Sequence, residues 1–186
     1  YPFDFSLFIN DHVICQRFFD EYNFKNDSVS FNQAIEKLYN AFHNNTLNPE
    51  CCNQCAVGNI LDNTDAWQHL SNFHGSTQLN YLGLVHQNLG RKFNGYSPIE
   101  LLQIEATFLK ACGYTLPLHH THKKPKSTPE NLFNGLEAVV KLLCQFDNVP
   151  NVMDCSILFD YKTERNTTKK FKLLKIFFIW SFYLNH

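Results

Sequence analysis

Four residues between positions 52 and 74 have the types and the spacing of a zinc site. Cys52 and Cys55 form a C-x2-C pair, His69 follows after 13 residues, and His74 after 4 more. This spacing falls within the range of zinc sites built from two cysteines and two histidines. Thiolate and imidazole groups are donors that suit Zn²⁺. The pattern therefore predicts a zinc site at Cys52, Cys55, His69 and His74, with Cys51 as a further candidate ligand.

The two spaced cysteines have two other interpretations. A C-x2-C thiol at the start of a helix has a lowered pKa, which suits a redox pair at Cys52 and Cys55. Alternatively, Cys55 is a small apolar residue that packs in the core beside Ala56 and Val57. The insert between the cysteine and histidine pairs reads as helical from its start, unlike the ββα unit of a zinc finger.

Apolar residues at helical spacing, together with capping residues, predict a mainly α-helical domain of about five helices. The clearest start is Ser97-Pro98-Ile99-Glu100, a capping box with proline at the first helical position, and Gly113 ends that helix. A long helix is expected over 128–146 and another from Ser30 to 43. Shorter helices are expected over 52–61 and 64–70, where Thr64 or Asp65 would cap the second. The apolar segment 79–89 fits a helix or a strand, and a helix is favoured.

Three segments are predicted along the chain. Residues 1–29 form an extension with a β-hairpin over 3–19, residues 30–160 form the helical domain, and residues 161–186 form a basic and apolar tail. The apolar run of the tail, 176–184, is shorter than the ~20 residues that span a bilayer. It is interpreted as a core element, as a segment that lies on a membrane surface, or as sequence that is not native.

The charge pattern excludes some classes of function. Residues 162–175 carry a net charge of +5 and the other residues −6, so the body is acidic and a protein partner is favoured over nucleic acid. No G-x-S-x-G, P-loop, G-x-G-x-x-G or H-E-x-x-H motif occurs in the sequence, which argues against the corresponding enzymes.

Other polar residues are expected to have structural roles. The sequence has seven cysteines, an odd number, and no signal peptide opens it, which favours reduced thiols and a cytoplasmic location. The cluster of histidines and lysines over 119–124 is expected to be a solvated loop rather than a metal or phosphate site. Glu105 is expected to pair with Arg91 or Lys92.

The middle of the chain resembles a group of small bacterial proteins. The resemblance rests on ECCNQCAVGNIL at 50–61, LVHQNLGRKFNGYSPIELLQIEATFL at 84–109, CGY at 112–114, LFNGLEAVVKLLC at 132–144 and NVMDCSILF at 151–159. Such proteins often carry the label of one component of the sodium-translocating NADH:quinone reductase, the component that holds a [2Fe–2S] cluster, FAD and an NADH site. The label implies those three groups here. The sequence lacks the four-cysteine arrangement that a plant-type cluster needs, and it lacks a flavin or NADH fingerprint.

Two functions are therefore expected. The first is a non-enzymatic helical binding domain, organised by zinc at the C-x2-C motif. The alternative is a redox or electron-transfer component, similar to that part of the NADH:quinone reductase, that uses thiol or iron–sulfur chemistry.

Overall fold

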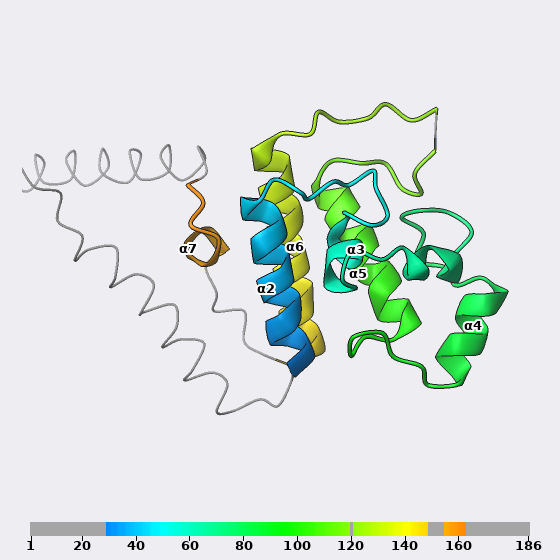
Figure 1. Cartoon of the computed structure of the whole chain (residues 1–186). Helices are drawn as coiled ribbons and strands as arrows, with labels where there is room; N and C mark the ends of the chain where they lie inside the picture. Colours follow the sequence, from blue (N-terminus) through cyan, green and yellow to red (C-terminus); the bar gives the residue numbers. More distant parts are fainter. Residues whose placement is uncertain (1–28, 120, 149–154, 163–186) are drawn as a thin grey trace, which may run out of the picture. The chain divides into compact units, whose positions relative to one another are not determined.

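The part of the chain that the computed structural model describes, residues 29–119, 121–148 and 155–162, is mainly α-helical (Figure 1). The chain divides into two units, residues 1–151 and 152–186, and each is described by itself. The helices of the first unit are α2 (Val29–His43), α3 (Ala56–Ile60), the 3-10 helix η1 (Ala66–Leu70), α4 (Tyr81–Asn88), α5 (Pro98–Ala111) and α6 (Pro129–Phe146). In the second unit α7 spans Cys155–Leu158. The predicted helical class is confirmed, whereas the hairpin over 3–19 and the tail after 162 lie outside the described residues.

The predicted capping box at the start of α5 is confirmed. The Ser97 N–H donates to Glu100 Oε2 at 2.7 Å, and the Glu100 N–H donates to Ser97 Oγ at 3.5 Å. Pro98 occupies the first turn, where its missing N–H leaves no hydrogen bond unmade. Gly113, at φ 95°, follows the end of the helix in the left-handed conformation that glycine adopts most readily. These local signals fix both ends of α5, the helix that carries Glu105.

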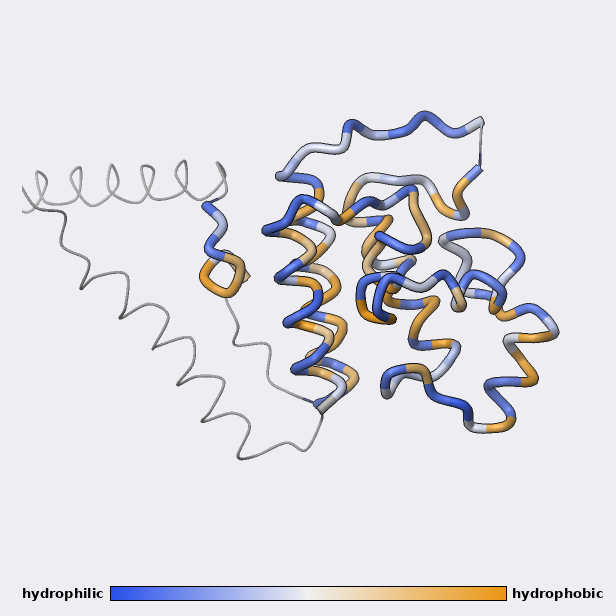
Figure 2. The backbone as a smooth tube through the Cα atoms, viewed as in Figure 1, coloured by the Kyte–Doolittle hydropathy of each residue, from blue (hydrophilic) through white to orange (hydrophobic). Residues whose placement is uncertain are grey.

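Helix α6 packs against both α5 and α2 and completes the core of the first unit. In Figure 2 hydrophobic and hydrophilic residues alternate along these helices at the helical period. The contact with α5 is close at Gly135, where an added Cβ would lie 2.5 Å from Cys112 Sγ and 2.7 Å from the Phe108 ring. The fully buried apolar side chains of this core include Ile35, Leu38, Leu101, Ile104, Phe108, Leu109, Leu136, Val139, Val140 and Leu143.

The two short helices near the cysteines differ in detail from the sequence prediction. Helix α3 begins after Cys55, not at Cys52, because the Cys55 sulfur caps it by accepting from the Gly58 N–H at 3.3 Å. The segment after it forms a 3-10 helix, and Asp65 makes no side-chain cap. Its carboxylate instead accepts from Gln68 Nε2 at 2.9 Å. Across the described residues, no helix combines the length and the apolar character that crossing a membrane requires.

The close α5–α6 contact predicts that Gly135→Ala lowers the free energy of unfolding. Helix propensity alone would stabilise the variant by roughly 1 kcal/mol. The added methyl group, however, meets Phe108 and Cys112, which are 0% and 2% exposed, so overpacking should dominate and destabilise by about 1–3 kcal/mol. Urea denaturation measures the difference. Glu137→Ala, at an exposed position of the same helix, is the control and should change stability by less than about 0.5 kcal/mol. A more stable Gly135→Ala variant would contradict the proposed contact.

Candidate metal centre

A carboxylate buried in the core is the central group of the candidate site. Glu105 lies on the apolar face of α5 and is 0% exposed. Its Oε2 accepts from the Val57 N–H in α3 at 3.3 Å, and its Oε1 lies 3.0 Å from His74 Nε2. A charged group that is removed from water needs a charged partner, hydrogen bonds or a metal ion. Glu105 therefore brings α5, α3 and the loop that carries His74 to one point.

The imidazole of His74 is held between two different partners. Its Nε2 faces Glu105, while its Nδ1 lies 3.9 Å from Cys52 Sγ. The ring of Trp67 packs edge-on against it, with centroids 5.3 Å apart. The backbone is fixed as well, since the Leu118 N–H donates to the His74 carbonyl at 2.8 Å. The side chain is 18% exposed, so one edge of the ring reaches solvent.

Cys55 completes a group of three metal-binding side chains. One ligand atom each from Cys55, His74 and Glu105 lies within 4.8 Å of the other two. Cys55 is 0% exposed and donates through its sulfur to the Cys52 carbonyl at 3.3 Å. That carbonyl also accepts from Trp67 Nε1 at 3.0 Å, which ties the C-x2-C turn to η1. The turn and the 3-10 helix thus position the thiol against the histidine and the carboxylate.

The electrostatics of the group disfavour free thiolates and favour the binding of a cation. Burial, and after it the negative charge of Glu105, raise the pKa of Cys55 well above its usual range. The same two causes raise the pKa of Cys52, and they raise the pKa of Cys112 to about 12. A metal-free site therefore holds protonated thiols at neutral pH. A divalent ion placed there would compensate the buried carboxylate and replace the thiol proton.

The donor set fits zinc in type and in scale. Sulfur, imidazole nitrogen and carboxylate oxygen are all zinc ligands in proteins. Two such donors on one tetrahedral ion lie roughly 3.4–3.6 Å apart. The upper bound of 4.8 Å on the separations here exceeds this range by about 1 Å, and the 3.0 Å between His74 Nε2 and Glu105 Oε1 is shorter than it, so zinc binding would draw some donors together and move this pair slightly apart. His74 would bind through Nε2, leaving Nδ1–H directed at the Cys52 sulfur.

The structure brings together only part of the set predicted from the spacing. Cys55 and His74 belong to the group of three, and Cys52 lies against the other ring nitrogen of His74. His69 is exposed, because η1 directs it away from the site, and it lies outside the group, as does the half-buried Cys51. Glu105 was expected to form an ion pair with a neighbouring base, and the structure pairs it with His74 instead.

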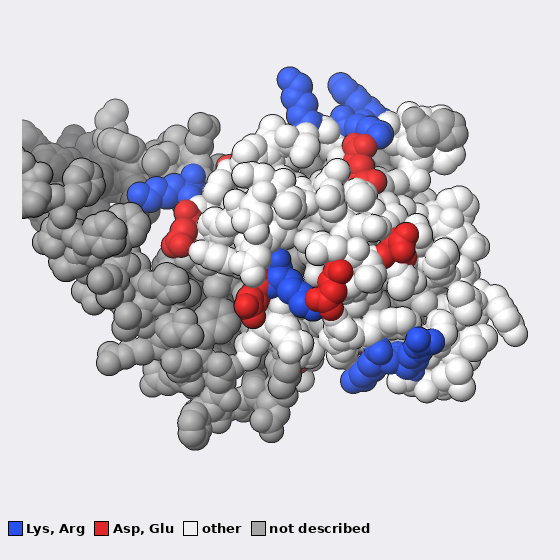
Figure 3. Space-filling model, viewed as in Figure 1, with Lys and Arg blue, Asp and Glu red and all other residues white. Residues whose placement is uncertain are grey.

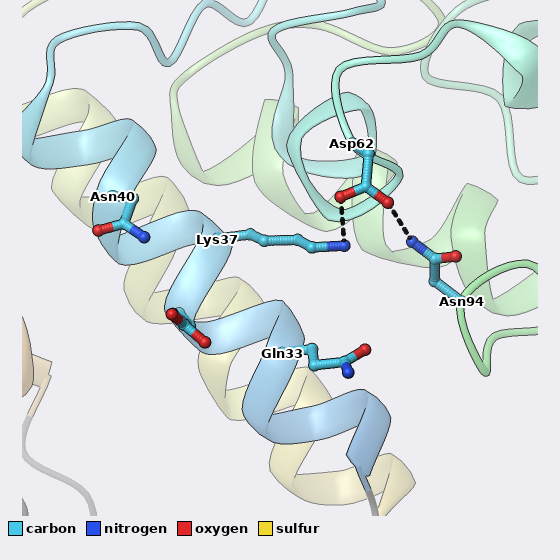
Figure 4. Close-up of a pocket in the computed structure, with 6 residues that line it drawn as sticks. Gln33, Lys37, Asn40, Asp62 and Asn94 are labelled. Atoms are coloured by element: carbon cyan, nitrogen blue, oxygen red, sulfur yellow. Dashed lines mark hydrogen bonds and ion pairs between the residues drawn. The ribbon is translucent and has the colours of Figure 1, made fainter.

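The histidine and lysine loop and a second polar hollow lie apart from this centre. A cavity of about 210 Å³ is lined partly by His119, His122 and Lys124, and Lys124 forms an ion pair with Glu50. A larger hollow of about 430 Å³ lies beside α2, and its six lining residues are polar (Figure 4). Across it Lys37 binds Asp62 at 2.7 Å, so its charged groups largely satisfy each other.

Comparison of the chain with models of known families, with characterised proteins and with solved structures gives no match. Interpretation of the site therefore depends on its own geometry.

The raised thiol pKa values predict slow alkylation. In metal-free protein at neutral pH, Cys52 and Cys55 should react with iodoacetamide more slowly than in the urea-unfolded chain, and the rate should rise with pH. Glu105→Gln should speed the reaction of Cys52, because removal of the negative charge lowers its pKa. Peptide mapping by mass spectrometry measures each rate. Faster reaction in the folded protein would contradict the direction of these shifts and would favour a redox pair.

Proposed function

We propose that the chain is a helical binding domain whose fold is stabilised by one zinc ion held by Cys55, His74 and Glu105. The observation that carries this proposal is the convergence of three metal-binding side chains from three separate segments. A water completes the tetrahedral set. Cys52 orients the imidazole through Nδ1, a role that carboxylates, backbone carbonyls or waters commonly have in zinc sites.

Burial favours a structural role for the ion over a catalytic one. Catalytic zinc also has three protein ligands and a water, but it keeps the position of the water open to substrate. Here two of the three ligands are 0% exposed, and only the edge of His74 reaches solvent. The ion would instead link three segments: the start of α3, helix α5, and the loop before α4. A buried ion pair between His74 and Glu105, without metal, is the simpler alternative, and metal analysis separates the two.

The redox alternative has less support. An iron–sulfur cluster needs four cysteine or histidine ligands, and the metal-binding group within the described residues contains one cysteine. A thiol pair needs a lowered pKa, whereas the pKa values of Cys52 and Cys55 are raised. The odd number of cysteines in the sequence supports the cytoplasmic location that we propose.

Elemental analysis of the purified chain tests the zinc proposal. We expect about one zinc per chain, given the tight binding of structural zinc. Chelation should lower the melting temperature, since an ion at a hundredfold excess over its Kd contributes about 2.7 kcal/mol to stability. Less than about 0.2 zinc per chain, from protein prepared without chelator, would overturn the proposal.

Variants distinguish the ligand set seen in the structure from the set predicted by spacing. Cys55→Ser and Glu105→Gln should lose stoichiometric zinc, and Cys52→Ser should bind it about 10–100-fold more weakly. His69→Ala is the matched control and should bind zinc like the unchanged chain. Loss of zinc in His69→Ala with retention in Glu105→Gln would show that the spacing identifies the ligands correctly and that the geometric assignment is wrong.

A further inference from the structure

Helix α4 has the reverse of the usual amphipathic arrangement. The residue of α4 that is buried is Gly83, whereas Tyr81, Leu82 and Leu84 are 84%, 44% and 48% exposed. In the described part of the chain six large hydrophobic side chains are exposed, and five of them lie between positions 73 and 89. We call these five the α4 patch: Phe73, Tyr81, Leu82, Leu84 and Leu89.

Close backbone approach and hydrogen bonds help to hold α4 in place, together with the edge-on contact between the His86 and Phe93 rings. An added Cβ at Gly83 would lie 2.3 Å from the Leu70 carbonyl oxygen, so α4 and η1 approach as closely as glycine allows. Asn80 caps the helix by accepting from the Gly83 N–H at 3.0 Å, and its Nδ2 donates to the His69 carbonyl at 3.0 Å. Gln87 Oε1 accepts from the Ile99 N–H at 3.1 Å. The patch side chains are therefore not needed to dock the helix.

The surroundings of the patch are basic. Residues 66–99 contain no aspartate or glutamate, and their charged residues are Arg91 and Lys92. Arg91 lies over the Phe93 ring, 5.1 Å from its centroid, immediately after the helix. In Figure 3 the lower right of the surface, where Figure 1 places α4, is uncharged apart from a group of lysine and arginine. A ligand for this surface needs an apolar face and negative charge at its edge.

We propose that the α4 patch is the binding surface of the domain and that it takes an amphipathic helix of a partner protein with acidic residues beside its apolar face. Five of the six exposed large apolar side chains of the described residues lie in this one segment, and exposed apolar residues that are concentrated in this way are typical of interaction sites in soluble proteins. The proposal rests on the binding function proposed above. A second copy of the chain would place Arg91 and Lys92 against an equally basic surface. Two basic residues are also fewer than the roughly 4–8 that cluster in segments which bind anionic membranes.

A displayed peptide library tests the occupant. Each peptide is an amphipathic helix with leucine or phenylalanine fixed on one face and glutamate or lysine varied at the flanking positions. Selection on the immobilised full chain should enrich glutamate over lysine. The best peptide, measured by fluorescence anisotropy, should bind at least tenfold more weakly to Leu84→Glu and to Leu89→Glu. Arg91→Glu should reduce the preference for glutamate.

Controls keep this result separate from folding and from the metal. Lys141→Glu changes an exposed residue of α6 in the same unit, outside the patch, and should bind like the unchanged chain. Helical circular dichroism and zinc content, measured on each variant, show whether the fold and the metal centre persist. A chain that contains no zinc when purified without chelator, but that binds the peptide, would contradict the zinc proposal and leave the patch proposal standing. The patch proposal would be overturned by the absence of binding clones, by equal enrichment of lysine, or by variants that bind normally. Dimers abolished by Leu84→Glu, or anionic vesicles bound in preference to peptide, would likewise overturn it.

Discussion

Glu105 is a carboxylate with no access to solvent, and the arrangement of the surrounding segments follows from the need to satisfy it. One oxygen takes the Val57 N–H and the other faces His74. Removing the partner of a buried charge costs about 3–5 kcal/mol in other proteins, a large share of the stability of a domain. The loop around His74 is therefore held to α5 by the charge at its centre as well as by apolar packing.

How far the sequence predicts this fold depends on the range of the interactions involved. Helix α5 is predicted closely because Ser97, Pro98 and Glu100 act within one turn. The start of α3 is set by the Cys55 sulfur, and the conformation of η1 depends on Trp67 reaching the carbonyl of Cys52, 15 residues away. Such distant contacts are not visible in the local pattern.

The same reasoning explains the partial prediction of the site. Spacing along the chain identifies Cys55 and His74 but does not say which way a 3-10 helix turns its side chains, so it also includes the exposed His69. Glu105 enters from a helix 31 residues beyond His74. The sequence feature that could have identified Glu105 was the presence of an acidic residue on the apolar face of a strongly capped helix. Its environment could not be inferred, because the nearby bases Arg91 and Lys92 offered a simpler partner.

The segment over 66–80 contacts both the candidate metal centre and helix α4. Trp67 packs against His74, while the carbonyls of His69 and Leu70 accept hydrogen bonds from Asn80, which caps α4. The absence of a side chain at Gly83 has a consequence for how the protein can evolve. Because α4 is anchored through its backbone, Asn80 and Gln87, its outer residues are free to change without disturbing the core. Binding preference can therefore diverge among descendants of this chain while the scaffold and its buried charge are preserved.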